Sequence, residues 1–320
     1  MTISILIEWD NPRLAGADRA ARMMRTLAVQ LRAAADAGLA TFEVLLGGAE
    51  QTLSTSLLER ICALWQESAR GRPPLQIHRL PLEDSSYYQL KNLLADRAQG
   101  EILIFLDSDV IPESGWLLQI LRPFCDPAVQ VVCSNSYVEL SSLFGRIMAL
   151  IWFFPLRSAD GSVKSTERFF ANSVAFRREL FLRYHFPRAR EMDRGSCLLL
   201  AGHLRESGIG IYENPEARVT HPAPNGCREF LVRALGEGRD AILRFRMSGT
   251  LRTRSHWFRS GCERLSQAVV RTTLQYRNVG LQALHLPAVF AVGVCFYSLC
   301  LCGATIAFIN PRFARLHFRL

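Results

Sequence analysis

The stretch KNLLADRAQGEILIFLDSDVIPESGW, residues 91–116, decides the fold that we expect for this chain. It predicts the end of a helix, a turn at Gly100 and an apolar strand over residues 101–106. That strand runs directly into Asp107-Ser108-Asp109, and a second helix is expected to begin a few residues later. Because open parallel sheets bind their ligands at the carboxyl ends of strands, these carboxylates are candidates for a binding site.

Two carboxylates at the end of a strand favour a hard divalent cation. With a turn between them, one of Asp107 and Asp109 reaches a ribose and the other a metal ion. Mn²⁺ and Mg²⁺ prefer such oxygen ligands. A D-x-D pattern alone arises often by chance, but its place after a helix, a glycine and a buried strand makes the interpretation stronger.

The flanking residues alternate short apolar runs with helical patterns. Strands are expected over residues 3–8, 42–46 and 75–82, and helices over residues 19–35 and 87–98. This alternation predicts an α/β fold whose parallel sheet is covered by helices on both faces.

Four motifs follow one another in chain order between residues 2 and 240. They are Lys91-Asn92 followed by Ala98-Gln99-Gly100-Glu101; Leu106-Asp107-Ser108-Asp109 with Pro112 and Trp116; Phe170-Ala171-Asn172-Ser173-Val174-Ala175-Phe176-Arg177-Arg178; and Gly208 to His221 (GIGIYENPEARVTH). In this order they resemble the motifs of family 2 glycosyltransferases, in particular the membrane-associated bacterial type. The resemblance implies a GT-A fold, which is Rossmann-like, with a mixed, mostly parallel sheet flanked by helices. It also implies transfer of a sugar from a nucleotide diphosphate sugar.

The resemblance further implies which residues serve the reaction. The nucleotide sugar would contact Asn11, Lys91, Asn92, Asp107 and Asn172, and a metal ion, Mn²⁺ or Mg²⁺, would be held by Asp107, Asp109 and His221. A neutral imidazole suits Mn²⁺ better than Mg²⁺. Structural alternatives stay open for three of these residues: a solvated helix charge for Lys91, a helix cap or surface amide for Asn92, and a surface histidine for His221.

The chain departs from the family pattern at the end of its second strand. Family members usually have an Asp pair there that contacts the nucleotide base, whereas this chain reads Leu45-Leu46-Gly47-Gly48-Ala49-Glu50. At the first strand, Glu8-Trp9-Asp10-Asn11 stands where the family often has P-x-Y-N. The identity of the base therefore cannot be inferred from the resemblance.

The expected catalytic base is also displaced. Inverting members place an acidic pair at the start of the helix before the last motif, and that pair falls on Ser196-Cys197 here. A general base must lie within roughly 3 Å of the acceptor hydroxyl. The nearest acids are Glu191 and Asp193, and Asp193 is the preferred candidate. Its alternative role is a helix cap or a partner for a neighbouring Arg, so inversion is implied by the resemblance but not fixed.

The composition excludes several classes of protein. Hydrophobic residues make up 49% of the chain and charged residues 21%, which excludes a disordered protein. The net charge of +9 favours an anionic partner, although it comes almost wholly from Arg, a bias that a GC-rich genome also produces. Nine Cys without a C-x-x-C pair predict reduced thiols facing the cytosol, and neither a disulfide framework nor a zinc site.

The C-terminal third predicts contact with a membrane. Residues 228–277 hold eleven Arg and four acids, a net charge of +7, which is typical either of a solvated helical face or of a surface on anionic headgroups. Residues 278–311 contain no Asp, Glu, Lys or Arg, and residues 286–309 are apolar throughout. A helix of that length covers about 36 Å, enough to cross a bilayer. A single crossing, a re-entrant segment and an in-plane segment all remain open.

A second apolar stretch, residues 142–156 (SLFGRIMALIWFFPL), is too short to span a bilayer. It is either a core helix or an amphipathic helix at the membrane interface beside an acceptor site.

Together these patterns favour a membrane-associated, metal-dependent enzyme. We expect a catalytic domain over residues 1–227, an Arg-rich region of interfacial helices over 228–280, and an apolar membrane segment with a short basic tail over 281–320. The donor would be a nucleotide diphosphate sugar and the acceptor a lipid-linked or envelope glycan. The protein would lie on the cytoplasmic face of the inner membrane, against anionic lipids, anchored by its C-terminal segment.

Other functions have less support. A nucleotidyltransferase is disfavoured because no Gly-rich, Lys-bearing loop follows the first strand. A nucleic-acid partner is not expected because the Arg-rich region lacks a recognisable motif. A non-catalytic, membrane-anchored binding or scaffold subunit stays open because the acidic pair is missing.

Overall fold

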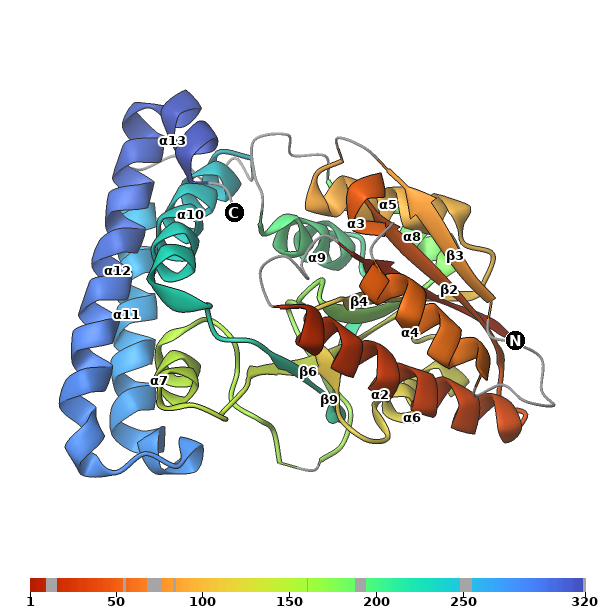
Figure 1. Ribbon diagram of the computed structural model, residues 1–320. Helices are drawn as coiled ribbons and strands as arrows, with labels where there is room; N and C mark the ends of the chain where they lie inside the picture. Colours follow the sequence, from red (N-terminus) through yellow and green to blue (C-terminus); the bar gives the residue numbers. More distant parts are fainter. Residues whose placement is uncertain are drawn as a thin grey trace. The chain divides into compact units, whose positions relative to one another are not determined.

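The computed structural model describes residues 1–9, 16–53, 56–67, 76–82, 85–159, 161–187, 194–247 and 255–318. The chain divides into two compact units (Figure 1). The first unit consists of Met1–Ser136, Arg157–Arg188 and Leu200–His221, and the second of Tyr137–Leu156, Ala189–Leu199 and Pro222–Leu320.

The first unit is built on a mixed sheet. Among the described residues its strand order is β3-β2-β1-β4-β8-β6-β9-β5, and β7 pairs with β9 beside this path. Strands β1, β2, β3 and β4 run parallel, whereas β8 is antiparallel to β4, and β5 to β9. The strands are β1 Thr2–Glu8, β2 Thr41–Gly48, β3 Gln76–Pro81, β4 Ile102–Asp107, β5 Ile111–Pro112, β6 Val131–Val138, β7 Lys164–Ser165, β8 Ser173–Arg177 and β9 Ile211–His221.

The described helices are α2 Ala17–Asp36, α3 Glu50–Leu53, α4 Ser56–Glu67, α5 Tyr87–Arg97, α6 Trp116–Leu121, α7 Leu143–Ile151, α8 Arg178–Arg183, α9 Ser196–Glu206, α10 Gly226–Met247, α11 Ser255–Gln275, α12 Leu286–Ile309 and α13 Pro311–His317. Helices α2 and α5 begin and end within two residues of the predicted ranges 19–35 and 87–98. Three short 3₁₀ turns, Arg122–Cys125, Tyr276–Val279 and Ala283–His285, complete the described elements.

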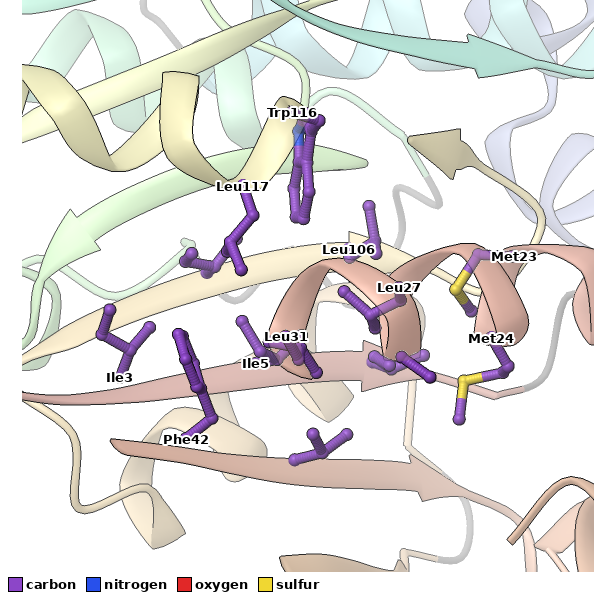
Figure 2. Packing of buried hydrophobic residues seen from close by; sticks show 14 of the residues in the cluster. Ile3, Ile5, Met23, Met24, Leu27, Leu31, Phe42, Leu106, Trp116 and Leu117 are labelled. Atoms are coloured by element: carbon purple, nitrogen blue, oxygen red, sulfur yellow. The ribbon is translucent and has the colours of Figure 1, made fainter. Parts of the chain in front are cut away.

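Alternate residues of the strands form the core on one face of the sheet. Ile3, Ile5 and Ile7 of β1 are fully buried against α2, α4 and α6. Figure 2 shows Leu27 and Leu31 of α2 above β1 and β2, with Trp116 of α6 on the same side. Because side chains alternate along a strand, the residues between these point to the opposite face.

Aromatic side chains fill the opposite face beneath α5 and α8. Phe105 of β4 packs with its ring centroid 4.7 Å from that of Phe181 and 5.5 Å from that of Phe186. Asp107 is two residues beyond Phe105 on the same strand, so its side chain lies on this face as well. The alternation of β4 therefore directs Asp107 towards α5.

The glycine of the first motif has a steric role at the amino end of β4. A Cβ at Gly100 would lie 2.6 Å from the backbone nitrogen of Ser4. The Gly100 amide donates to the Ser4 hydroxyl (2.8 Å), and the buried Glu43 carboxylate accepts from the amide of Gln99 (2.6 Å). This part of the motif fixes the start of β4, at the edge of the sheet opposite to Asp107.

The second unit holds the two apolar stretches. In α7, six of the nine residues are buried, which favours the core helix over the interfacial helix. Among the described helices, α12 is long and apolar enough to cross a membrane, by length and composition only.

Candidate functional site

The parallel strands end together at one edge of the sheet. The register aligns Glu8 at the end of β1 with Asp107 at the end of β4 and with Gly47 near the end of β2. Both acidic residues are buried. The candidate site is therefore the edge predicted from the sequence, with Glu8 as an additional carboxylate next to Asp107.

Asp107 is held by two side chains of α5. The Tyr87 hydroxyl donates to both carboxylate oxygens (2.9 and 2.8 Å), and the Lys91 ammonium donates to Oδ1 (2.6 Å). Lys91 is 0% exposed, and its Nζ also lies 4.7 Å from the centroid of the Tyr87 ring. A buried carboxylate bound to a buried ammonium is held in a defined position.

The helix spacing explains why Tyr87 and Lys91 meet the same carboxylate. Residues four apart lie on one face of a helix, one turn above the other. Helix α5 begins at Tyr87, after Ser86, which forms a capping box with Gln89. The cap thus fixes the first turn, where Tyr87 stands.

Tyr87 remains a hydrogen-bond donor at all ordinary pH values. Burial, followed by the negative charge of Asp107, raises the pKa of the Tyr87 hydroxyl well above its usual value of about 10. The neutral phenol is the form that donates to the carboxylate. Sequence reasoning treated Tyr87 only as the start of a helix, although its spacing from Lys91 is a signal that could have identified it.

Asn92 links α5 to the segment after α8. Its Nδ2 donates to the carbonyl of Phe186 (2.9 Å), and its Oδ1 accepts from the amide of Phe186 (3.1 Å). The side-chain amide therefore makes a hydrogen bond at each end within the protein. This geometry favours a structural role over the predicted contact with a nucleotide.

Asp109 and His221 are brought together by strand pairing. Ile111 of β5 lies opposite Thr220 of β9 in an antiparallel pair, so His221 lies opposite the residue before Ile111. Asp109 follows one position further along, and both Asp109 and His221 are buried. The fold thus places these two predicted metal ligands on neighbouring segments.

Arg19 of α2 joins the same two segments. Its Nε donates to the carbonyl oxygen of Asp109, and its Nη2 donates to the carbonyl of Thr220 (3.0 Å). Nothing in the local sequence around Arg19 signals this role, because both partners are distant along the chain. One guanidinium therefore fixes the backbone beside both predicted ligands.

Asn172 presents a buried donor beside Asp107. Its carbonyl accepts from the Asp107 amide (3.1 Å), and its Oδ1 accepts from the Ser136 hydroxyl (2.9 Å). Within the described residues, Nδ2 of Asn172 and the hydroxyl of Ser108 are buried without a hydrogen-bond partner. Such unsatisfied groups are uncommon in folded proteins and mark a place for a ligand or a water.

The residues present are suited to a divalent cation whose remaining ligands are phosphate oxygens of the substrate. The described part of the chain contains no group of three or more His, Cys, Asp or Glu side chains able to hold a metal ion. Mg²⁺, however, is usually bound through one or two carboxylates together with phosphate oxygens and waters. Asp109 and His221 match that smaller set of ligands.

Three of the predicted site residues lie outside the described residues. They are Asn11, Glu191 and Asp193. Their roles therefore stay predictions. Ser196 and Cys197, which occupy the positions of the family's acidic pair, are the buried first residues of α9.

Comparison with known proteins agrees with this architecture. Residues 77–184 match the family described as Glycosyl transferase family 2. The chain is also similar to the pre-mycofactocin glycosyltransferase of Mycobacterium tuberculosis, in the strains CDC 1551 / Oshkosh and ATCC 25618 / H37Rv. The identity is 30% over 137 residues, which are 42% of this chain and 29% of the relative, so the match spans less than a third of the curated relatives.

Two solved structures share the fold. One is the mannosyltransferase PcManGT from Pyrobaculum calidifontis, in complex with GDP-Man and Mn²⁺, with a TM-score of 0.57 and 14% identity over 97% of this chain and 87% of that one. The other is GalNAc-T7 with UDP, GalNAc and Mn²⁺, with a TM-score of 0.50 and 17% identity over 70% of this chain and 43% of that one. At these identities the likeness establishes the fold alone, which is the expected GT-A fold.

Proposed function

We propose that the chain transfers a sugar from a nucleotide diphosphate sugar to an acceptor hydroxyl, with Mn²⁺ or Mg²⁺ as cofactor, because residues 77–184 match the glycosyl transferase family 2 and the fold is GT-A. The observation that carries this proposal is the carboxylate of Asp107, fixed by Tyr87 and Lys91 where β4 ends beside Asp109 and His221. Relatives that share the fold and hold GDP-Man or UDP together with Mn²⁺ lend support by analogy.

In this proposal Asp107 orients the nucleotide. A carboxylate has about four lone-pair sites, and the bonds from Tyr87 and Lys91 leave room for one more donor, such as a ribose hydroxyl. Lys91 and Asn92 then support the site from within, Lys91 by holding Asp107 and Asn92 by holding the Phe186 backbone. Asn172 offers its unpaired Nδ2 to an oxygen of the donor sugar.

Asp109 and His221 would hold the metal ion. When bound, the cation neutralises negative charge that develops on the departing diphosphate. Arg19 supports both ligands by binding the backbone carbonyls of Asp109 and of Thr220, the residue before His221. The predicted role of Asp107 as a direct metal ligand is less favoured than that of Asp109, because Asp107 already accepts from an ammonium and a phenol.

We further propose that the reaction inverts the sugar in a single displacement. The acceptor oxygen forms a bond to the anomeric carbon, the bond from that carbon to the diphosphate oxygen breaks, and a carboxylate takes the hydroxyl proton. Asp193, or failing that Glu191, would be this base, since the two family positions are Ser196 and Cys197. The predicted contact between Asn11 and the nucleotide sugar is part of the same proposal.

The acceptor is proposed to be a lipid-linked or envelope glycan. The support is the apolar helix α12, which lets the chain attach to a membrane, on whose cytoplasmic face nucleotide sugars are available. Attachment would keep the enzyme where such an acceptor resides.

A donor screen tests the proposed function directly. Purified full-length protein is incubated with GDP-linked and UDP-linked sugars, with Mn²⁺, Mg²⁺ or EDTA, and thermal shift and diphosphate release are measured. We expect one donor to stabilise the protein and to be hydrolysed or transferred slowly, with full loss in EDTA. Donor binding without any diphosphate release, even with candidate acceptors, would favour the non-catalytic subunit. No binding of any donor would overturn both.

A further inference from the structure

Helix α12 exposes an apolar face along its whole length. Only 28% of its most apolar window is buried, so it is not the enclosed core helix of a soluble domain. Val294 is 64% exposed and Ile309 is 76% exposed. The exposed large side chains recur at helical spacing: Phe290, Val294, Leu301 and Phe308.

The other face of α12 is bound tightly to α10. The two helices lie side by side in the second unit (Figure 1). A Cβ added at Gly238 of α10 would lie 1.8 Å from the carbonyl oxygen of Cys300, and one added at Gly303 would lie 2.1 Å from that of Leu235. The backbones therefore touch at two glycines, and α12 cannot leave α10 without losing this close contact.

Helix α10 is unsuited to the interior of a bilayer. Eight of its 22 residues are charged, and two of them, Arg239 and Asp240, are buried as an ion pair (2.7 Å). Gly238 meets Cys300, which stands in the middle third of α12, so Arg239 and Asp240 lie level with the centre of that helix. If α12 crossed a membrane, this pair would lie at the depth where charge is most costly.

Arginines border both ends of the apolar helix. Arg277 is exposed before α12, and Arg312 is exposed after it. At the same carboxyl end, Arg246 of α10 is exposed and donates from Nη2 to the carbonyl of Phe308 (3.3 Å). Cations at both ends fit a helix whose two ends meet the headgroups of one leaflet, and a single crossing would send one end to the opposite side.

Much of the remaining Arg-rich region is engaged within the protein. Arg264 binds Glu237 (2.8 Å), and Arg233 binds Glu229. Arg271 donates to the carbonyls of Trp152 (3.1 Å) and Phe154 (2.8 Å), just after α7. The basic surface available to lipid is therefore smaller than the net charge of +7 implies.

From these contacts we infer that α12 lies in the plane of the membrane, at the boundary between headgroups and acyl chains of one leaflet. Its exposed apolar face contacts lipid, its opposite face packs on α10, and the charges of α10 stay outside the hydrocarbon. Phe313 and Leu316 of α13, both exposed, extend the same contact beyond the helix end. This inference deepens the membrane attachment in the proposed function and does not depend on the sugar transferred.

Labelling from one side of the membrane tests the topology. Cysteine is introduced into the full-length chain as Arg277→Cys or Arg312→Cys, with the other reactive cysteines replaced by serine, and an impermeant maleimide is added to inverted and to right-side-out vesicles of the expressing cell. We expect both positions to react in inverted vesicles only. Reaction of one position in each kind of vesicle would show that α12 spans the membrane and would overturn the inference.

A matched pair of variants tests the lipid contact itself. Val294→Arg places a charge on the exposed face of α12, and Val29→Arg places one on α2, where Val29 is 70% exposed. We expect Val294→Arg to weaken binding to vesicles of phosphatidylcholine with phosphatidylglycerol by about tenfold or more, and Val29→Arg to have no effect.

Two results would contradict this lipid contact. Equal vesicle binding by both variants would show that the exposed face of α12 does not contact lipid. A change in oligomer mass on Val294→Arg, without a change in vesicle binding, would show that a second copy of the chain covers this face instead. Diphosphate release is measured in parallel. If the membrane placement of α12 is wrong but diphosphate release is unchanged, the proposed reaction still stands. Loss of diphosphate release would instead count against the reaction.

Discussion

The hydroxyl of Tyr87 is the most direct test of the clamp on Asp107. Tyr87→Phe removes one oxygen atom and keeps the ring, so the hydrogen bond that the hydroxyl shares between the two carboxylate oxygens, at 2.9 and 2.8 Å, is lost without a large cavity. A hydrogen bond to a charged group contributes about 1.5–3 kcal/mol to stability. Lys91 keeps its own bond of 2.6 Å, so the carboxylate is not left unpaired, and we expect a loss near the lower end, about 1.5 kcal/mol.

The expected loss depends on pH in a defined way. Burial and the Asp107 carboxylate raise the pKa of Tyr87 in the folded chain, whereas an unfolded tyrosine titrates near pH 10. Above about pH 10 the unfolded state loses this proton while the folded state keeps it, so the wild type loses stability as the pH rises towards the folded pKa. Tyr87→Phe lacks this loss. The difference in free energy of unfolding between the wild type and the variant should be constant from about pH 6 to 9 and should become smaller above about pH 10.

Urea unfolding followed by circular dichroism, at neutral and at alkaline pH, measures both effects. Tyr184→Phe is the matched control, because the Tyr184 hydroxyl makes no hydrogen bond to the described part of the chain. The control should leave the free energy of unfolding within about 0.5 kcal/mol of the wild type. If Tyr87→Phe behaves like the control at neutral pH, Tyr87 does not hold Asp107, and the reasoning about the clamp is wrong.

Three further variants test other parts of the site and the fold. Asp109→Asn should reduce turnover by about a hundredfold or more without unfolding the protein, as measured by diphosphate release with Mn²⁺, and full activity of the wild type in excess EDTA would contradict the metal role. Asp193→Asn should lower kcat by about 10²–10⁴ with donor affinity little changed, and a near-normal kcat would direct attention to Glu191. Gly303→Val should destabilise the second unit by about 1–3 kcal/mol or more in thermal unfolding, because its Cβ would lie 2.1 Å from a carbonyl of α10. Gly202→Ala in α9, with no atom within 4 Å of its added Cβ, is its control and should be neutral or stabilising.

The fold could be predicted from the sequence because its signals are local. The apolar run 102–106 and the residues around it have the period of a buried strand, and α12 begins and ends at the residues where the apolar stretch does. Helix α7 was ambiguous, because a short helix with a single charged residue, Arg146, suits a core and an interface equally well. The structure favours a core helix because six of its residues are buried by segments distant in the sequence, and a local pattern carries no information about those segments.

The site was predictable only where a motif carries it. Asp107 and Asp109 follow directly from the strand that precedes them, and the pairing of Ile111 with Thr220 brings His221 close to Asp109. Arg19 was missed because its role depends on two backbone carbonyls about 90 and 200 residues away, a relation that no spacing reveals. The position of Lys91 on its helix likewise does not reveal that its ammonium is buried against Asp107.

The departure at the end of β2 lies next to the same clamp. A Cβ at Gly47 would lie 2.8 Å from Cδ2 of Leu94 and 3.0 Å from Cδ1 of Leu90, so α5 packs closely against β2, and a larger residue at this position requires both leucine side chains to shift. That close approach sets the position of α5, the helix that carries Tyr87 and Lys91 to Asp107. A side chain at Gly47 would first displace Leu90 and Leu94, which stand on the same helix as Tyr87 and Lys91. The glycine at the position where the family has an acidic residue and the clamp on Asp107 therefore belong to one contact between α5 and β2.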